Sequence, residues 1–505
     1  MTNGPLNDVA ATTDFTRNPL LAIVVIGASG DLAKRKTYPS LFSLYQRKLL
    51  PSHTIVWGYS RSRLTHDSLR KQIRPFLQAS ISESPQNEEL LQSFLNMCFY
   101  QRGTGYDDIN AYHSMHSSIG IQKKAVEKCL KDREITSSQR HQNHLFYLAI
   151  PPNLFHTATQ TITQSFATIP QDSLRILFEK PFGRDTESYL HLSNSLSKLP
   201  GIHESQMLRI DHYLGKDMIR AIPSLRFNNP WARAIWNRKY ISHIVISMKE
   251  TIGTAGRGGY FDQYGVIRDI IQNHLLQVMT LVAMEEPETT ITSNVEGMRD
   301  AKCRLLEDVK IPTREDCVVG QYVGYKDDEQ VPDESCTPTF AVIKLFVDNE
   351  RWRGVPFVLL AGKSLEEKSS EIRVVFRSDI GSRNELTIRI QPENEISLTT
   401  NVAGNDYGDG MKQETMVLNL KKETEENHMP NADGAYSKLI YDALKGNSSS
   451  FVRDDELRLS WEICTPLLHQ IEKNRPYPYE IGSRGPPQAQ RILDNDDHHH
   501  GRSRL

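Results

Sequence analysis

The sequence predicts a doubly wound α/β domain followed by a separate, sheet-rich domain. An apolar strand at residues 20–26 runs through a glycine turn into a helix, and a second β-rich segment at 53–62 follows about thirty residues later, which is βαβ spacing. After about residue 210, apolar and polar residues alternate as they do in half-buried antiparallel strands. A chain of 505 residues seldom keeps a single core, so two domains are expected.

The first part of the chain predicts a parallel sheet. Residues 1–19 are polar and contain two prolines, so we expect a flexible leader and order from about Leu20. Within the predicted domain at 20–209, further strands fit 144–152 and 174–181, which end at turns rich in Pro or Gly. Ligands of such sheets gather at the carboxyl ends of the strands, so we expect the site there.

The second part, at residues 210–490, predicts a sheet and one long buried helix. Residues 265–284 have apolar side chains on all sides at helical spacing, which indicates a buried helix. The connections at 286–315 and 400–434 carry no strong pattern, and residues 491–505 are expected to form a flexible tail. The alternating segments that predict strands are 240–250, 339–348, 371–377 and 384–392.

Composition excludes several classes of function. The chain has 60 Lys and Arg against 62 Asp and Glu, and this net charge of −2 gives no global field to hold nucleic acid or an anionic membrane. The longest apolar stretch, Leu20–Ile26, is far shorter than the roughly 20 residues that cross a bilayer. The N-terminus shows no secretory signal or transit peptide. Six cysteines without CxxC spacing predict neither a disulfide framework nor a zinc site.

The segment GASGDLA predicts a dinucleotide-binding turn. Gly27 and Gly30 fall where the first strand meets its helix, and glycine lets backbone N–H groups and the helix dipole approach a pyrophosphate. The pattern departs from GxGxxG because Ala28 precedes Ser29 and Ala33 takes the third glycine position. The alternative is a tight turn that needs glycine only to pack the helix on the strand.

The end of the second strand favours NADP over NAD. An NAD enzyme places an acidic residue there to bind the ribose hydroxyls, but this chain reads GYSRS, with Arg61 in that place. A guanidinium suits a 2′-phosphate, and Ser29 and Lys36 offer further donors. The alternative for Arg61 is a solvated charge at a strand end.

Two later segments are dense in groups able to do chemistry. RIDHYLGKDM contains an orienting carboxylate and several phosphate donors, and the segment from residue 249 to 277 adds carboxylates and one imidazole. Asp269 and His274 are five apart on the predicted helix, which gives them partly overlapping faces. A lone histidine on an apolar helix is more often structural, so that alternative stays open for His274. The residues concerned are Arg209, Asp211, His212, Tyr213, Lys216, Lys249, Glu250, Asp269 and His274.

Six segments together resemble the glucose-6-phosphate dehydrogenase family: GASGDLAKRK, EKPFGRD, RIDHYLGKDM, GRGGYFDQYGVIRDIIQNHLLQ, NELTIRIQP and FVRDDEL. The resemblance runs in order from about Ala22 to Pro486. It implies an N-terminal Rossmann-like coenzyme domain and a C-terminal α+β domain with a large antiparallel sheet. It also implies self-association through that sheet, as a dimer or a tetramer.

The resemblance also implies roles for individual residues. His274 matches the general base that removes the proton from the C1 hydroxyl, and Asp211 matches the carboxylate that orients this imidazole. His212, Tyr213 and Lys216 match the positions that bind the 6-phosphate, and Lys180 lies near the sugar and the nicotinamide. The matching positions around the sugar and phosphate are Glu250, Asp269, Lys363 and Gln391, and those around NADP are Gly27, Ser29, Gly30, Asp31, Lys36 and Arg61.

The chain departs from the family pattern at several positions. Asp217 replaces the usual Glu beside the phosphate site, and Leu360 and Lys368 stand where many members have arginines. Some members hold a second, structural NADP; we expect that site to be absent or weak here. Its positions carry Leu360, Ser369, Ser397, Thr399 and Asn419, and only Arg373, Arg389 and Arg484 remain.

The last three residues, Ser503-Arg504-Leu505, resemble the S-K-L class of peroxisomal address, although a chance match is the alternative. We therefore expect a cytoplasmic or peroxisomal location, the latter through an import receptor. Histidines 498–500 are read as exposed tail residues, and no metal is expected.

The expected activity is the NADP-dependent oxidation of glucose 6-phosphate to 6-phosphogluconolactone. Asp217, Leu360 and Lys368 leave open the same chemistry on another aldose, such as unphosphorylated glucose. A catalytically silent regulatory homologue is the third reading. Retention of His274, Asp211 and Lys216 together argues against it.

Overall fold

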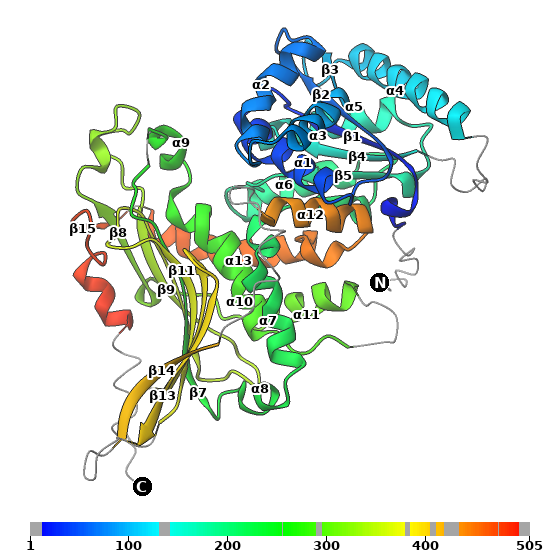
Figure 1. Cartoon of the computed structure of the whole chain (residues 1–505). Coiled ribbons are helices and arrows are strands. Elements are labelled where there is room, and N and C mark those ends of the chain that lie inside the picture. Colours follow the sequence, from blue (N-terminus) through cyan, green and yellow to red (C-terminus); the bar gives the residue numbers. More distant parts are fainter. Residues whose placement is uncertain are drawn as a thin grey trace, which may run out of the picture. The chain divides into compact units, whose positions relative to one another are not determined.

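The structure is a computed structural model that divides into two compact units (Figure 1). Unit 1 comprises Met1–Phe182, His191–His212 and Asn427–Arg453, and unit 2 comprises Gly183–Leu190, Tyr213–Glu426 and Asp454–Leu505. The chain therefore crosses between the units more often than the single boundary predicted near residue 209. The described residues are 13–130, 142–254, 256–288, 295–378, 384–403, 411–418, 434–472 and 474–493.

Unit 1 is built on a six-stranded, fully parallel sheet with the order β3-β2-β1-β4-β5-β6. This is the strand order of a Rossmann fold, in which the order reverses between β1 and β4. Every residue of β1, β4 and β5 is buried, as expected for strands covered on both faces. The strands are β1 (Leu20–Ile26), β2 (His53–Ser60), β3 (Cys98–Arg102), β4 (Asn143–Leu148), β5 (Leu174–Phe178) and β6 (Met207–Arg209).

The helices of unit 1 form two groups. Helix α1 packs with α2, α3 and α12, α2 also packs with α3, and α4 packs with α5. Chain-distant α12 shares a core with α1 and the sheet, which explains why residues 427–453 belong to this unit. The helices are the π-helix η2 (Ala33–Thr37), α1 (Tyr38–Gln46), α2 (His66–Gln78), α3 (Pro85–Asn96), α4 (Ile109–Leu130), α5 (Phe155–Ser165) and α12 (Gly434–Lys445). The chain re-enters unit 1 within α6 (Thr186–Ser197).

Residues shortly before Leu20, which were predicted as part of a flexible leader, are folded. Residues Phe15–Arg17 form the 3₁₀ helix η1, and the Phe15 ring is fully buried under the guanidinium of Arg175 at 3.9 Å. One aromatic side chain among polar neighbours gives little periodic signal, so the sequence did not reveal this anchor.

Unit 2 contains a nine-stranded sheet with the order β14-β13-β12-β11-β7-β10-β9-β8-β15. Most neighbours are antiparallel; β10 runs parallel to β7, and β15 runs parallel to β8. The predicted fold class, a Rossmann-like domain followed by a domain with a large antiparallel sheet, is confirmed. The strands are β7 (Ile241–Lys249), β8 (Cys317–Tyr322), β9 (Phe340–Phe346), β10 (Pro356–Gly362), β11 (Ser369–Phe376), β12 (Asn384–Gln391), β13 (Glu395–Ala403), β14 (Met411–Leu418) and β15 (Tyr477–Tyr479).

The helix predicted at 265–284 consists of two parts, a π-helix that runs directly into an α-helix. Two further elements lie in connections for which the sequence showed no pattern, α11 in 286–315 and β14 in 400–434. Among the described residues, no helix is both long and apolar enough to cross a membrane. The helices of unit 2 are α7 (Asp217–Phe227), α8 (Pro230–Ile235), α9 (Gly258–Asp262), η8 (Ile267–Leu275), α10 (Leu276–Ala283), α11 (Val295–Glu307) and α13 (Asp454–Ile471).

The predicted tail is only partly outside the described structure. Ile492 is buried, and Arg491 donates a hydrogen bond to the carbonyl of Cys317. Ser503-Arg504-Leu505, histidines 498–500 and Asn419 lie outside the described residues.

Candidate active site

The predicted dinucleotide turn lies at the carboxyl edge of the unit 1 sheet. Gly27 directly follows β1 and has a φ of 87°, and a Cβ there would lie 2.3 Å from the carbonyl oxygen of Ala149, just after β4. The N–H of Gly27 donates to the carbonyl of Tyr59 at 2.8 Å. Only glycine permits both this conformation and this close approach, so the turn sits tightly at the point where the strand order reverses.

The turn after β1 is joined to the end of β2. The hydroxyls of Ser29 and Ser62 lie 2.8 Å apart, and a Cβ at Gly58 would lie 2.7 Å from the Cβ of Ala28. Because β1 and β2 are parallel neighbours, their carboxyl ends deliver Ser29 and Arg61 to one place. The structure therefore brings these two predicted coenzyme residues together.

Arg61 is exposed, and its guanidinium lies 5.6 Å from the ring centroid of Tyr106. Stacking on an aromatic face orients the planar fork while its outer edge stays available to an anion. Asp31 is also exposed and forms an ion pair with Arg35 at 2.8 Å. Lys36 lies one residue before the end of the π-helix η2, a helix type that is frequent at functional sites.

These residues fit NADP. The glycine turn permits close approach of a diphosphate, Ser29 offers a hydroxyl, and the strand end carries a guanidinium where an NAD enzyme needs a carboxylate.

Two further carboxyl ends of the same sheet carry predicted substrate residues. Glu179 and Lys180 directly follow β5, while Asp211 and His212 follow β6. The two strands are parallel neighbours, and the N–H of Ile210 donates to the carbonyl of Phe178. The His212 ring stacks on Tyr436 with centroids 5.9 Å apart. Lys180, Asp211 and His212 thus occupy the edge that the parallel sheet predicts.

Glu179 is a titratable group at this edge that the sequence analysis did not select. Burial raises the pKa of its carboxyl to about 7, although a hydrogen bond from Tyr147 and the charge of Lys180 lower it. The hydroxyl of Tyr147, on β4, donates to Oε1 of Glu179, and burial raises the pKa of Tyr147 so that it remains a donor. A signal was available, because Glu179 follows an entirely apolar strand and precedes Lys180 in EKPFG.

In unit 2, Glu250 and Lys363 form an ion pair. Glu250 follows β7 and Lys363 follows β10; these strands are parallel and in register, with Gly362 opposite Lys249. The ammonium of Lys363 also lies 5.2 Å from the ring centroid of Phe261. Two residues more than one hundred positions apart are therefore placed together by the one parallel pair in the middle of the sheet.

The predicted base His274 is buried, with 2% of its surface exposed, and its ring stacks on Tyr213 with centroids 4.6 Å apart. The ammonium of Lys216 lies 5.1 Å from the centroid of the same tyrosine. The Tyr213 hydroxyl lies 3.4 Å from that of Ser370, and Ser370 pairs with Gln391 between β11 and β12. Unit 2 therefore places Lys216 and His274 against the ring of Tyr213, and Ser370, the strand partner of Gln391, at its hydroxyl.

His274 and Asp269 lie in the π-helix η8, which packs on β7 and β10. In an α-helix, residues five apart differ by roughly 140° around the axis, whereas i→i+5 bonding brings them closer to one face. No feature of the residue pattern predicted the π conformation. Ser370 was also missed, because a serine at a strand start is common.

The predicted site residues are divided between the units. Gly27, Ser29, Gly30, Asp31, Lys36, Arg61, Lys180, Asp211 and His212 lie in unit 1, and Tyr213, Lys216, Glu250, Asp269, His274, Lys363 and Gln391 lie in unit 2. Asp211 belongs to unit 1 and His274 to unit 2, so the orientation of His274 by Asp211 stays a prediction. The chain passes between the units at His212–Tyr213, inside the phosphate-binding motif.

Comparison with known proteins finds one family along nearly the whole chain. Residues 24–221 match the model for the NAD binding domain of glucose-6-phosphate dehydrogenase, and residues 223–501 match its C-terminal domain. A glucose-6-phosphate 1-dehydrogenase from Aspergillus niger is 40% identical over 487 residues, which cover 92% of this chain and 89% of the relative. The cytoplasmic isoform from Solanum tuberosum is 40% identical over 491 residues, covering 94% and 91%.

Solved structures of the same family are also similar to this chain. A glucose-6-phosphate dehydrogenase in complex with its substrate glucose-6-phosphate has a TM-score of 0.83 at 37% identity, covering 96% of this chain and 98% of that chain. A glucose-6-phosphate 1-dehydrogenase from Mycobacterium avium has a TM-score of 0.79 at 28% identity, covering 94% and 97%.

Proposed function

The chain belongs to the glucose-6-phosphate dehydrogenase family, and from that premise we propose how its residues divide the work of the reaction. The enzyme is an oxidoreductase that acts on a CH–OH group: it oxidises glucose 6-phosphate at C1 to 6-phosphogluconolactone and produces NADPH. This is the first step of the oxidative pentose phosphate pathway. The single observation that carries the assignment of residues is the buried imidazole of His274, stacked on Tyr213 of the phosphate-binding motif.

NADP, when bound, supplies the hydride acceptor. The turn at Gly27, Ser29, Gly30 and Asp31 would hold the diphosphate at the carboxyl edge of the unit 1 sheet, with Lys36 as a further donor. Arg61, held on Tyr106, would bind the 2′-phosphate. Lys180, at the end of β5, would serve the sugar and the nicotinamide.

His274 acts as the general base. Its neutral imidazole removes the proton from the C1 hydroxyl as hydride leaves C1, and the carboxylate of Asp211 stabilises the imidazolium that results. Burial of the ring keeps water away from the proton acceptor, and stacking on Tyr213 fixes the plane of the ring.

The remaining residues hold the substrate. His212, Tyr213 and Lys216 bind the 6-phosphate, and Lys216 stays poised over the Tyr213 ring. The Glu250–Lys363 pair presents a carboxylate and an ammonium to the sugar and phosphate, and Asp269 and Gln391 complete the hydrogen bonds.

Substitution of His274 by Asn tests the assignment. We expect kcat to fall about 10²–10⁴-fold, because proton transfer is lost, while the Kd for NADP stays unchanged. His113→Asn, at an exposed position on α4, is the matched control and keeps full activity. Steady-state rates with glucose 6-phosphate and with glucose, measured on the same proteins, separate the phosphorylated substrate from an unphosphorylated aldose. Near-normal turnover in His274→Asn would show that His274 is not the general base.

We propose that the enzyme self-associates as a dimer or tetramer through the unit 2 sheet. β14 is an edge strand, and Met416, Val417 and Leu418 are each 48% exposed on it. Exposed apolar edge strands invite pairing with another chain. Val417→Lys is expected to shift the mass measured by light scattering toward the monomer, and an unchanged mass would place the contact elsewhere.

We propose that a structural NADP is absent or weakly bound. Each arginine that remains at its expected positions has a carboxylate partner: Arg373 pairs with Glu385 at 2.9 Å, and Arg484 pairs with Glu366 at 2.9 Å. Arg389 pairs with Glu395 at 3.3 Å. Gel filtration with and without NADP is expected to give the same oligomer, and a stoichiometry of two NADP per chain would contradict the proposal.

We propose a cytoplasmic location with a peroxisomal fraction read from Ser503-Arg504-Leu505. Deletion of Leu505 in a fluorescent fusion should abolish any punctate label, and an unchanged distribution would dispose of the signal.

A further inference from the structure

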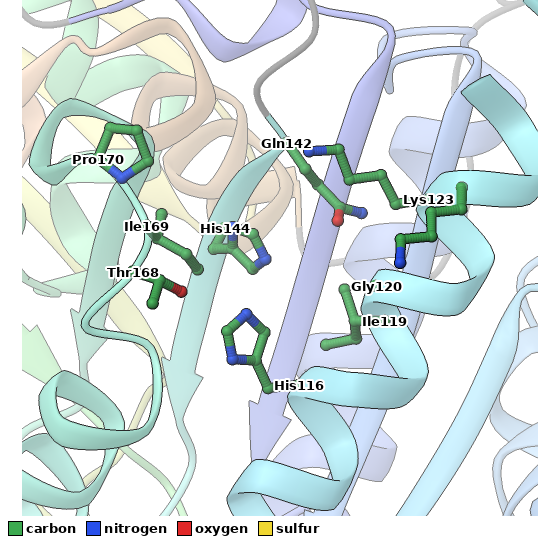
Figure 2. A pocket seen from close by; sticks show the side chains of 10 residues that line it. His116, Ile119, Gly120, Lys123, Gln142, His144, Thr168, Ile169 and Pro170 are labelled. Carbon is green, nitrogen blue, oxygen red and sulfur yellow. The ribbon is translucent and has the colours of Figure 1, made fainter.

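Unit 1 contains a cavity of about 290 Å³ that lies away from the coenzyme turn (Figure 2). It is lined by residues from α4, by the start of β4, and by the turn before β5. The coenzyme turn lies at the carboxyl ends of the strands, whereas His144 is the second residue of β4. The five steps along the chain from His144 to Ala149 span roughly 17 Å, so the two sites are at opposite ends of the parallel strands.

The lining of the cavity combines two positively charged side chains with several polar ones. The described lining residues include Lys123 and Lys124, two histidines and Gln142, and they include no carboxylate. Positions 116, 119, 120, 123 and 124 recur every three to four residues, so one face of α4 forms a wall. In Figure 2 the His116 ring from α4 and the His144 ring from β4 point into the same space.

His144 carries the strongest sign of a ligand. The side chain is 3% exposed, and neither ring nitrogen has a hydrogen-bond partner of good geometry among the described residues, although the backbone of Gln142 lies close enough to interact weakly with the ring. Burial lowers the pKa of His144 to about 3, against a smaller opposing effect of the Gln142 backbone, so the ring is neutral at physiological pH. A neutral imidazole has one N–H donor and one acceptor nitrogen, and leaving both unsatisfied in a buried site is costly.

His116 differs from His144 because its Nδ1 lies 3.0 Å from the carbonyl oxygen of Ser165 and its ring stacks on Phe166 at 4.4 Å. It is thus held in place and forms a fixed wall, with its ring centroid 6.5 Å from that of His144. Burial also lowers the pKa of His116. The positive charge of the cavity therefore comes from the two lysines.

We propose that this cavity binds a small phosphomonoester that also carries a hydroxyl group, with the phosphate at Lys123 and Lys124 and the hydroxyl at His144. A phosphomonoester carries nearly two negative charges near pH 7, which two ammonium groups balance. A hydroxyl both donates and accepts, so it can bond either the bare nitrogen or the N–H of a neutral ring, and it satisfies one of the two nitrogens. The volume is at the lower end of ligand pockets, which favours a ligand of a few carbon atoms.

Glycerol 3-phosphate is the probe, titrated calorimetrically into the full-length enzyme saturated with NADP. Gly120→Leu fills the cavity without a clash at its root, because a Cβ at Gly120 meets no atom within 4 Å. Gly120→Leu and the double variant Lys123→Ala/Lys124→Ala are each expected to weaken binding at least about tenfold. Lys128→Ala, exposed on the same helix, is the matched control and binds as the wild type does.

A second arm tests the hydroxyl. The wild type is expected to bind methyl phosphate about tenfold more weakly than glycerol 3-phosphate, and His144→Phe is expected to abolish this preference. The thermal midpoint and turnover with glucose 6-phosphate establish that each variant is folded. A further variant, Lys216→Ala, removes phosphate affinity at the substrate site and leaves binding in the cavity intact.

Absence of saturable binding by the wild type would overturn the proposal. So would full affinity in Gly120→Leu, or loss of binding in Lys216→Ala together with its retention in the lysine double variant, since the probe would then occupy the substrate site. None of these outcomes depends on the assignment of His274, so this proposal and the catalytic one fail separately.

Discussion

At the residue scale, the position of each functional side chain is set by the carboxyl end of the strand that it follows. Gly27, Arg61, Lys180 and Asp211 each follow a strand of one parallel sheet, so they share an edge although they are far apart in sequence. Their neighbours decide what they can do. Glu179 is the clearest case, because an entirely buried strand delivers its carboxyl to a site next to a lysine.

Glu179 should make stability depend on pH. Its folded pKa of about 7 lies above the unfolded value of 4.5. The contribution of protonated Glu179 to the free energy of unfolding is therefore fully present below pH 4.5 and is lost as the pH rises through 7. The side chain of Glu179→Gln cannot ionise, so the variant does not lose this stability as the pH rises. The difference in free energy of unfolding, variant minus wild type, should therefore increase by about 3 kcal/mol between pH 4.5 and pH 8. Urea denaturation at both pH values measures this.

Glu187→Gln serves as the control for the loss of a carboxyl, since Glu187 is exposed. Its stability should follow that of the wild type at both pH values. A pH-independent difference between Glu179→Gln and the wild type would mean that Glu179 does not titrate in this window.

At the scale of elements, two π-helices stand where α-helices would be expected from periodicity. Both hold predicted site residues: η2 contains Lys36, and η8 contains Asp269 and His274. A π turn shifts the face that a helix presents by accommodating one more residue per hydrogen-bonded ring, at some cost in backbone geometry. The sequence pattern of an amphipathic helix does not distinguish the two forms over nine residues.

Helices α11 and α13 are joined by a buried ion pair. Lys302 and Glu456 are both 0% exposed, with Nζ and Oε1 2.8 Å apart, and Lys302 also donates to Gln277 on α10 at 3.2 Å. Lys302→Met should lower the free energy of unfolding by about 3–5 kcal/mol, because it leaves a buried carboxylate without its cation. Chemical denaturation measures the loss.

The double variant Lys302→Met/Glu456→Leu should recover most of this stability, because neither charge then remains in the interior. Exposed Lys310, paired with Asp348 at 3.4 Å, provides the contrast, and Lys310→Met should cost less than about 1 kcal/mol. Equal losses for Lys302→Met and the double variant would show that packing, rather than charge pairing, decides the effect.

At the scale of the whole molecule, chain-distant segments complete each unit. In unit 1, the Arg175 guanidinium from β5 covers Phe15, donates to the carbonyls of Thr13, Ala443 and Leu444, and so ties the N-terminal segment to the end of α12. Burial lowers the pKa of Arg175 to about 10, still high enough to keep it charged near pH 7. Residues 13–19 are therefore part of the folded unit.

Phe15→Ala should destabilise the enzyme by about 3–5 kcal/mol, the usual cost of emptying a fully buried phenylalanine site. Phe76→Ala is the matched control: its ring lies under Arg35 at 5.4 Å but is only partly buried, so the loss should be well below half as large. Thermal unfolding of both variants measures the difference. Equal thermal midpoints for Phe15→Ala and the wild type would show that residues 13–19 do not stabilise the folded unit.

The residue pattern was enough to predict the local elements and to identify the chemical groups of the site. Apolar runs, alternation and glycine turns depend on neighbours along the chain, so the strands at 20–26 and 384–391 and the turn at Gly27 could be predicted. The choice of NADP rested on Arg61 at a strand end, which is also local.

Tertiary structure alone decided which distant groups meet. The pairing of Glu250 with Lys363 follows from the parallel register of β7 and β10, and the stacking of His274 on Tyr213 follows from the packing of η8. The burial that raises the pKa of Glu179 and lowers that of His144 is likewise set by neighbours from other segments. These properties depend on distance and burial in three dimensions, and a linear pattern contains neither.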